Sequence, residues 1–242
     1  MTRDAGGTPE AGGLFWWRRD VRPGVTVAFT RARAGNLAFH VGSDDDAVRR
    51  SREGLAAAAG VAGFRFMSQV HGADAVWADD AGSAPTADAL LSRGEPLAVM
   101  VADCVPVILA GSFADGSPAF AAVHAGRPGL AAGVVPEAVA RLRAAGAAGL
   151  AAWLGPSICG GCYEVPAALR EEVEAAVPGT AATTSWGTPA LDLPAGVLRQ
   201  LEAEGVPAHT DAAACTYEEH ALYSHRRAPG EGRFAGLVWS HA

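Results

Sequence analysis

The chain of 242 residues contains no lysine, so all 19 of its basic residues are arginines. This absence excludes enzymes that form a Schiff base on a lysine. It also excludes nucleotide-binding proteins that hold phosphates with a P-loop lysine, and hydrolases that use a serine–lysine pair. Three large groups of mechanisms are therefore closed to this protein.

Long hydrophobic runs and an excess of positive charge are also missing. No apolar stretch approaches the roughly 20 residues that a membrane-spanning helix needs. The formal net charge of -7 argues against general binding to nucleic acid. The first ten residues include Asp4 and Glu10 and lack the basic and apolar segments of a signal peptide. We therefore expect a cytoplasmic protein with neither a membrane nor a nucleic-acid partner.

Cysteine is scarce, and in a cytoplasmic chain the four cysteines are interpreted as thiols or metal ligands before disulfides. Cys159 and Cys162 form a C-x-x-C pair in "SICGGCYEV", and "CTYEEH" adds Cys215 and His220. Together they can form a closed structural zinc site of three cysteines and one histidine. The alternative is that these cysteines are small side chains in glycine-rich turns, with no metal or redox role.

The pattern along the chain mixes strands and helices without a repeat. Residues 1–13 are rich in Gly, Pro and Thr and are predicted to be a disordered lead-in, followed by a single domain over residues 14–242. Helices are predicted at 45–59, 129–149, 166–177 and 194–205. Strands are predicted at 25–32, 64–70, 74–79, 98–110, 118–124, 150–156 and 233–239. This order indicates an α+β domain with an antiparallel or mixed sheet.

Polar residues interrupt the apolar run "AVMVADCVPVILA" at residues 98–110. Pro106 has no N–H to donate to a sheet, so regular pairing is predicted to break near it. Asp103 and Cys104 would then lie at a bend that faces a cleft. His71 lies at a predicted turn between two strands, and His124 lies where an apolar strand meets a Gly/Pro turn.

Two imidazoles and one thiolate suit zinc or copper, and three protein ligands leave a fourth position open. The alternative is a buried thiol with two hydrogen-bonded histidines, because the spacing matches no local metal motif. A third interpretation makes Cys104 the nucleophile of a cysteine hydrolase, with a histidine and Asp103. Separately, the segment "LYSHRRAPGEGRF" has arginines that can clamp a phosphate or carboxylate, namely Arg226, Arg227 and Arg233.

Five motifs occur in a characteristic order: "SQVHGADAV", "ADALLS" with "LAVMVADCVPVIL", "AAVHAGRPGL", "LGPSICGGCYEV" and "CTYEEHALYSHRRAPGEGRFAGLVW". With them, the chain resembles the YfiH-type family over residues 25–239. Members of this family are called laccase-domain or multicopper polyphenol oxidase proteins, and also purine nucleoside phosphorylases. The resemblance implies a single-domain, four-layer α-β-β-α sandwich with mixed sheets.

The resemblance also implies a metal site, with zinc as the first expectation and copper as the second. The catalytic residues and metal ligands carried over are His71, Cys104 and His124. The implied reaction is cleavage of adenosine- or inosine-type nucleosides by phosphate to the base and ribose 1-phosphate. Adenosine deaminase and methylthioadenosine phosphorylase activities are implied beside it. The expected partners are small molecules, and the expected state is a monomer or small homo-oligomer.

The expected substrate-binding residues are four. Arg31 or Arg226 would hold phosphate, and Asn36 would contact the nucleoside. The family commonly reads "HAGWRG" where this chain reads "HAGRPG", so any role of that arginine passes to Arg127 or is lost. Asp103 is expected to hold the bend or a ligand by hydrogen bonds.

Three other functions remain open from the sequence. One is a copper-dependent, laccase-like polyphenol oxidase. A second is a cysteine hydrolase or editing factor in peptidoglycan precursor synthesis, with Cys104 as nucleophile. A third is a non-enzymatic protein with a filled structural zinc site.

Overall fold

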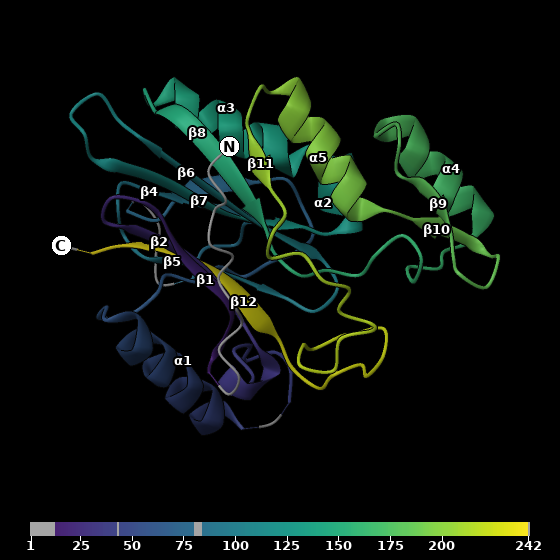
Figure 1. The fold of residues 1–242 in the computed structure, drawn as a ribbon, viewed down its shortest axis with the longest axis horizontal. Coiled ribbons are helices and arrows are strands. Elements are labelled where there is room, and N and C mark those ends of the chain that lie inside the picture. The colour runs from purple at the N-terminus through teal and green to yellow at the C-terminus, as the bar shows by residue number, and fades with distance from the viewer. Residues whose placement is uncertain (1–12, 43, 80–83, 242) are drawn as a thin grey trace, which may run out of the picture.

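The computed structural model describes residues 13–42, 44–79 and 84–241, which form four layers (Figure 1). One helix covers an antiparallel sheet, a second sheet packs against the first, and the remaining helices cover the far face. The expected α-β-β-α sandwich is therefore confirmed. The predicted disordered lead-in, residues 1–13, lies outside the described residues except for Gly13.

The first sheet has four antiparallel strands in the order β1-β2-β12-β5. Their bounds are β1 Phe15–Arg22, β2 Val25–Thr30, β12 Phe234–Ser240 and β5 Leu97–Val101. The last strand of the chain thus lies in the middle of the sheet, beside the second. Successive side chains alternate between its faces: Val27 and Phe29 point to the other sheet, and Ala28 points to the outer helix.

The second sheet has six strands in the order β11-β8-β6-β7-β4-β3. Their bounds are β11 Ala208–His209, β8 Ala148–Leu154, β6 Val105–Ser112, β7 Pro118–Ala125, β4 Ala89–Ser92 and β3 Ala75–Trp77. The outer pairs are parallel and the inner pairs antiparallel, so this sheet is mixed. Its strands are buried on both faces: Val107 and Leu109 face the helices, and Ile108 faces the first sheet.

Helix α1, Asp45–Ala59, has the bounds that the sequence predicts, because both of its ends are set by neighbouring residues. The Asp44 carboxylate accepts the Ala47 N–H at 2.8 Å, and Gly60 ends the helix in the left-handed conformation, with φ of 74°. Leu55 packs this helix on the antiparallel sheet.

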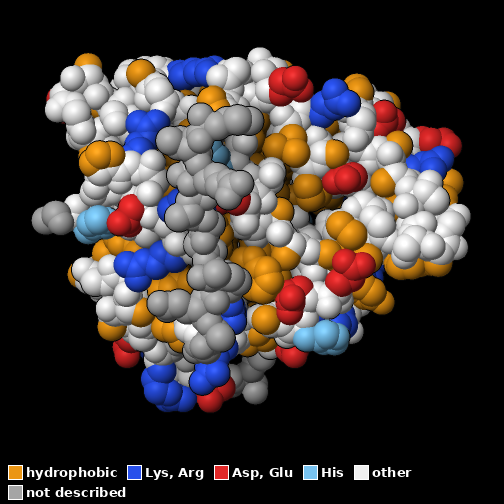
Figure 2. Space-filling view, in the orientation of Figure 1, with side chains coloured by type: hydrophobic (Ala, Val, Ile, Leu, Met, Phe, Trp, Pro, Cys, Tyr) orange, Lys and Arg blue, Asp and Glu red, His pale blue; other side chains and the backbone are white. Residues whose placement is uncertain are grey.

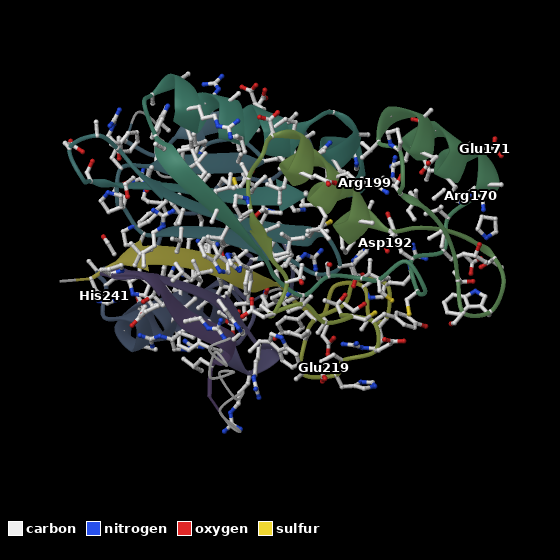
Figure 3. The ribbon with its side chains drawn as sticks, turned by 45° about the horizontal axis from the view of Figure 1, so that its top comes forward. Arg170, Glu171, Asp192, Arg199, Glu219 and His241 are labelled. Carbon is white, nitrogen blue, oxygen red and sulfur yellow. The ribbon has the colours of Figure 1, made fainter. Side chains whose placement is uncertain are left out.

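The helices on the other side are α2 Arg127–Ala131, α3 Val134–Ala144, α4 Ala167–Ala176 and α5 Leu193–Ala203. Asp192 begins α5 (Figure 3), where its carboxylate accepts the Ala195 N–H at 2.9 Å. A short hairpin, β9 Ala181–Thr183 and β10 Pro189–Leu191, lies beside α4, and the 3-10 helix Ala32–Ala34 follows β2. Among the described residues, no helix has the length and hydrophobicity to cross a bilayer.

The single helix predicted at 129–149 is wrong, because the segment contains the separate helices α2 and α3. Gly133 lies between them with φ of 85°, which a right-handed helix does not accommodate. The strand predicted at 64–70 is also absent. Arg65 bridges Leu97 of the first sheet and Ser68 bridges Thr86 beside the second, so the segment crosses between the sheets and pairs at length with neither.

The break predicted near Pro106 occurs two residues earlier, between β5 and β6. Pro106 itself lies in β6 opposite His124. Its carbonyl accepts the Gly155 N–H at 3.0 Å, so its nitrogen faces the end of β8, beyond the final register pair Val107–Leu154. Because β8 has already ended at this position, the missing N–H removes one hydrogen bond at the end of the ladder and none from its interior, which is why a proline is tolerated inside this strand.

Candidate metal and catalytic site

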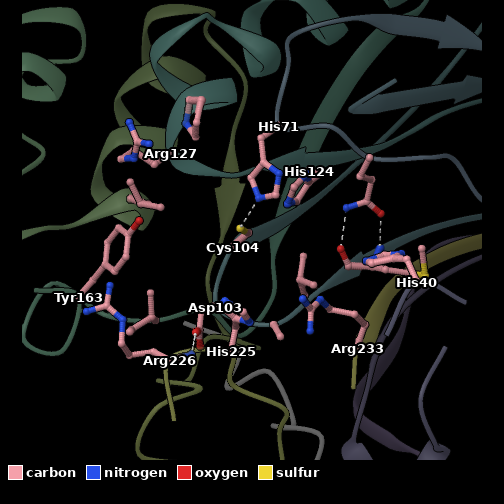
Figure 4. Close-up of a pocket in the computed structure, with 17 residues that line it drawn as sticks. His40, His71, Asp103, Cys104, His124, Arg127, Tyr163, His225, Arg226 and Arg233 are labelled. Carbon is pink, nitrogen blue, oxygen red and sulfur yellow. Dashed lines mark hydrogen bonds between the residues drawn. The ribbon is translucent and has the colours of Figure 1, made fainter. Parts of the chain in front are cut away.

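Three side chains from different elements meet in one place (Figure 4). His71 comes from the loop before β3, Cys104 from the bend between β5 and β6, and His124 from β7. Their ligand atoms all lie within 4.8 Å of one another. Cys104 Sγ is 3.7 Å from His71 Nε2, and the two imidazole rings meet edge to face with 4.6 Å between centroids. The structure therefore brings together the three residues that the sequence grouped.

The backbone around this site is strained at two positions. His71 has φ of 61° and Asp103 has φ of 88°, and they are the non-glycine residues with positive φ in the part of the chain that the structure describes. The strained backbone conformation of each such residue destabilises the fold by about 1–3 kcal/mol, and surrounding contacts must compensate for it. The compensation comes from two carboxylates, Asp88 beneath His71 and the Asp103 side chain itself.

Asp88 is a buried carboxylate that organises both histidines. Its oxygens accept the backbone N–H groups of Val70 at 3.2 Å, His71 at 2.9 Å and Gly72 at 2.6 Å. Nδ1 of His124 is 2.7 Å from the same carboxylate. Burial by itself raises the pKa of Asp88, but these hydrogen bonds and the charge of His124 outweigh it and the pKa is lowered.

Sequence reasoning assigned Asp88 no role, although it lies in the "ADALLS" motif. One signal was available: a carboxylate at the start of an apolar strand must be paired or hydrogen-bonded, since burying it alone is too costly. The identity of its partners was not available, because they lie 16 to 36 residues away along the chain.

Cys104 and His124 strongly shift each other's pKa. Burial opposes ionisation of the thiol, but the charge of His124 and hydrogen bonds from both histidines lower the pKa of Cys104 to about 6. Burial likewise lowers the pKa of His124, but the Cys104 thiolate and the Asp88 carboxylate outweigh it and raise the pKa to about 9. The thiolate is the form of cysteine that binds metals and acts as a nucleophile, and at neutral pH it is the form present here.

The donor set fits zinc or copper. Asp88 holds Nδ1 of His124, which leaves Nε2 as the ligand atom of that ring. The 3.7 Å between Cys104 Sγ and His71 Nε2 is close to the roughly 3.5 Å that a tetrahedral zinc site requires, with Zn–S of about 2.3 Å and Zn–N of about 2.0 Å. Two nitrogens and one sulfur leave a fourth position for water or substrate.

A cavity of about 340 Å³ opens on these three residues (Figure 4). Part of its wall is apolar, from Met100, Val101, Ile158 and Leu193. The remainder carries cationic and aromatic side chains: His40, Arg127, Tyr163, His225, Arg226 and Arg233. An apolar wall with a few convergent polar groups is typical of a site for a small molecule.

Arg127 and Arg226, two of the four expected substrate-binding residues, line this cavity. Arg127 begins α2. The Arg226 guanidinium donates to the Glu164 carbonyl at 2.9 Å and lies 5.1 Å from the centre of the Tyr163 ring. One face of the cavity therefore has a guanidinium whose remaining N–H groups are available to an anion.

The structure does not bring Arg31 and Asn36 to the cavity wall. Nε of Arg31 donates to the Phe15 carbonyl at 2.9 Å. The amide of Asn36 donates to two backbone carbonyls of its own loop. Its oxygen accepts the Arg233 N–H at 3.0 Å, so Asn36 supports a cavity arginine from behind.

Asp103 holds the bend that carries Cys104, as expected. Its carboxylate accepts the Thr216 hydroxyl at 2.6 Å and the Arg226 N–H at 2.7 Å, and its carbonyl accepts the Ile158 N–H at 2.9 Å. The triad interpretation that paired a histidine with Asp103 is wrong in this detail. The carboxylate at His124 is Asp88, because both oxygens of Asp103 are engaged elsewhere.

The other three cysteines form a separate group. Cys159, Cys162 and Cys215 lie together, and their fourth neighbour is Glu218. The predicted fourth member, His220, does not belong to the group. The turn that follows Cys215 brings the residue three positions on, rather than five, to the sulfurs. All four cysteines of the chain are free thiols.

An α-β-β-α domain with a two-histidine, one-cysteine centre in an arginine-lined cavity defines the class: a laccase-domain protein with a candidate metal site. A family model described as multi-copper polyphenol oxidoreductase laccase matches residues 23–241. The chain belongs to this family, as the sequence motifs indicated.

Comparison with known proteins gives close relatives. A purine nucleoside phosphorylase of Streptomyces coelicolor is 45% identical over 242 residues, covering 92% of this chain and 98% of the relative. One of Streptomyces griseus is 46% identical, covering 84% and 86%. Among solved structures, a Neisseria meningitidis protein of the DUF152 family has a TM-score of 0.80 at 30% identity, covering 95% of this chain and 100% of that one. YlmD from Geobacillus stearothermophilus has a TM-score of 0.77 at 27% identity, covering 95% and 99%.

Proposed function

We propose that this protein is a purine nucleoside phosphorylase that acts at the His71–Cys104–His124 centre. The observation that carries the proposal is the composition of one cavity, in which an ionised sulfur–imidazole centre shares its space with Arg127, Arg226 and Arg233. The relatives named purine nucleoside phosphorylase, at 45% identity and near full length, support it. The proposed substrates are inosine, adenosine and methylthioadenosine, with adenosine deamination as a side activity.

Phosphorolysis needs a phosphate held beside the ribose. An oxygen of phosphate attacks C1′, and the bond from C1′ to the purine nitrogen breaks with its electron pair leaving on the base. The cavity arginines hold and orient the phosphate, because one guanidinium group can donate two parallel hydrogen bonds to two phosphate oxygens. In a chain without lysine, arginine is the side chain left for this task.

The apolar part of the wall suits the flat purine. Met100, Val101, Ile158 and Leu193 provide that surface, and Tyr163 lines the same cavity. Negative charge develops on the departing base, and cationic groups fixed around a cavity stabilise such charge more than water does.

Asp88 gives the centre its orientation. It fixes the His124 ring through Nδ1 and positions the His71 backbone, so that both Nε2 atoms and the sulfur converge. A metal held by His71, Cys104 and His124 would supply a Lewis acid at this point of the cavity. Zinc is the proposed metal and copper the alternative, because both accept nitrogen and sulfur donors.

The test is an assay of purified protein on the three nucleosides with and without phosphate, with metal content measured on the same sample. The expected result is phosphate-dependent release of free base and ribose 1-phosphate. A matched pair separates site from scaffold: Arg226→Gln is expected to lose activity, and Arg170→Gln, on α4 away from the cavity (Figure 3), is not. Absence of base release at ample enzyme and phosphate would contradict the proposal.

A cysteine hydrolase is the second candidate, because the site contains a possible catalytic triad. The Cys104 thiolate contacts the His124 imidazole, which in turn contacts the Asp88 carboxylate, as a nucleophile, a base and an orienting acid do. In this reaction the sulfur would attack an amide or ester carbonyl. A thioester trapped on Cys104 with a peptidoglycan-precursor substrate supports it. Phenol oxidation by the copper-loaded protein under oxygen tests another alternative, a polyphenol oxidase.

A further inference from the structure

The second sulfur group, Cys159, Cys162, Cys215 and Glu218, lies on two loops next to the cavity wall. We propose that these four residues form a structural zinc site, separate from the His71–Cys104–His124 centre, which fastens the two loops together. Three sulfurs and one carboxylate oxygen would complete a tetrahedron and leave no position for substrate.

The four donors sit on two turns of the same spacing. In the first, the Cys162 N–H donates to the Cys159 carbonyl at 3.0 Å. In the second, the Glu218 N–H donates to the Cys215 carbonyl at 3.2 Å. Each turn therefore has two intervening residues and brings the side chains at its two ends to the same side of the backbone. The arrangement is C-x-x-C facing C-x-x-E, and paired short turns of this kind are typical of structural zinc sites.

Backbone hydrogen bonds hold the two turns against each other. Ser157 forms a parallel bridge with Cys215. The Ser157 N–H donates to the Ala214 carbonyl at 3.0 Å, and the Thr216 N–H donates to the Ser157 carbonyl at 3.1 Å. The ligand atoms of the four residues lie within 4.8 Å of one another as a result.

The distances and charges suit zinc. Cys162 Sγ is 3.6 Å from Glu218 Oε1, close to the roughly 3.5 Å expected between sulfur and oxygen around a tetrahedral zinc. Among the described residues, no arginine or histidine forms an ion pair with Glu218. A carboxylate beside three thiols therefore lacks a cation, and a divalent ion would provide one.

The position of the group explains what the site would do. Ile158 and Tyr163 flank the first turn and both line the 340 Å³ cavity. Thr216 follows Cys215 and donates to Asp103, which carries the bend of Cys104. Zinc bound here would hold the cavity wall in place. A Cys159–Cys162 disulfide is the competing state, and it would leave Cys215 and Glu218 without a function.

The experiment uses the full chain with Cys104→Ala, so that the first centre has no sulfur. This protein is expected to bind one equivalent of Co²⁺ with intense thiolate-to-cobalt charge-transfer absorption, and one equivalent of zinc in its place. Adding Glu218→Gln is expected to weaken cobalt binding by at least about tenfold. Substitutions of residues that only hydrogen-bond to a metal ligand already cause a loss of this size. Glu219→Gln, the neighbouring carboxylate on the same loop (Figure 3), and His220→Ala are matched controls expected to bind as before.

Three results would overturn the proposal. The first is a Cys104→Ala protein with reduced thiols that binds neither ion. The second is cobalt absorption that survives Cys162→Ser. The third is a Cys159–Cys162 disulfide in protein purified without oxygen. Circular dichroism shows whether each variant is folded, and Glu218 is exposed, so its substitution tests the site even where a cysteine variant fails to fold.

Discussion

The two sulfur groups of this protein are built differently. In the centre of His71, Cys104 and His124, the donors come from three separate elements, and a buried carboxylate and two strained backbone positions hold them. In the group of Cys159, Cys162, Cys215 and Glu218, two local turns carry all four donors. The first centre opens on the 340 Å³ cavity, and the second brings together four donors, the number that a closed tetrahedral site needs. Donors from distant segments need a buried residue to align them, whereas donors on short turns are aligned by the turns.

Asp88→Ala is the change expected to have the largest effect on the first centre while leaving the second group unaffected. It leaves three backbone N–H groups and the His124 ring without an acceptor, and we expect a loss of about 3–5 kcal/mol in the free energy of unfolding. Urea denaturation measures it. The second group should keep its metal in the folded fraction. A loss below about 1 kcal/mol would show that Asp88 is not the organising residue.

Cys104→Ala is expected to lower kcat/KM for phosphorolysis by at least about 10²-fold, the loss seen when one stabilising group is removed from a reaction centre. Its effect on stability should be small, because the thiol is a small side chain at the wall of the cavity and its removal leaves no enclosed void. Cys215→Ala is the matched cysteine change in the other group and should leave the chemical step intact. Equal losses of activity in both variants would contradict the proposal that the first centre is catalytic and the second group structural.

The pH dependence of thiol alkylation separates the two groups further. The pKa of Cys104 is lowered to about 6, so its reactive thiolate is present above that pH and lost below it. Burial and the neighbouring thiols raise the pKa of Cys162, so its thiolate is absent throughout the neutral range. With a chelator present, iodoacetamide should label Cys104 first, with a midpoint near pH 6. Faster labelling of Cys162 at pH 7 would contradict this.

Arg127→Gln is expected to have the smallest effect of the four, a rise in KM for phosphate of about tenfold with little change in stability, since one charged hydrogen bond contributes about 1.5–3 kcal/mol. Steady-state kinetics with phosphate varied measures it. Arg141→Gln, on the exposed face of α3, is its control. A fall in kcat at unchanged KM would instead place Arg127 at the reacting bond.

Charged side chains of both signs share the surface of this protein. On the face shown in Figure 2, arginine and acidic side chains are interspersed rather than gathered into one basic region. The formal net charge of the whole chain is -7, a balance that favours solubility.

Prediction from the sequence succeeded where the cause is local. Helix α1 has its predicted bounds because Asp44 and Gly60 act within a few residues. Prediction failed where the cause is distant. Gly133 divides one predicted helix into two, and Glu218 rather than His220 faces the three thiols, since both outcomes depend on the exact turn of the backbone.

The sequence by itself determined the α+β class, the absence of lysine chemistry and the grouping of His71, Cys104 and His124, because these depend on residue type and on where strands end, while the layered arrangement followed from the family resemblance. Only the tertiary structure decided that Asp88 holds the centre, that Arg233 joins Arg127 and Arg226 in the cavity, and that Arg31 and Asn36 lie outside it. These are meetings of segments far apart in the chain. Packing of two sheets brings them about, and no local pattern records which segments will meet.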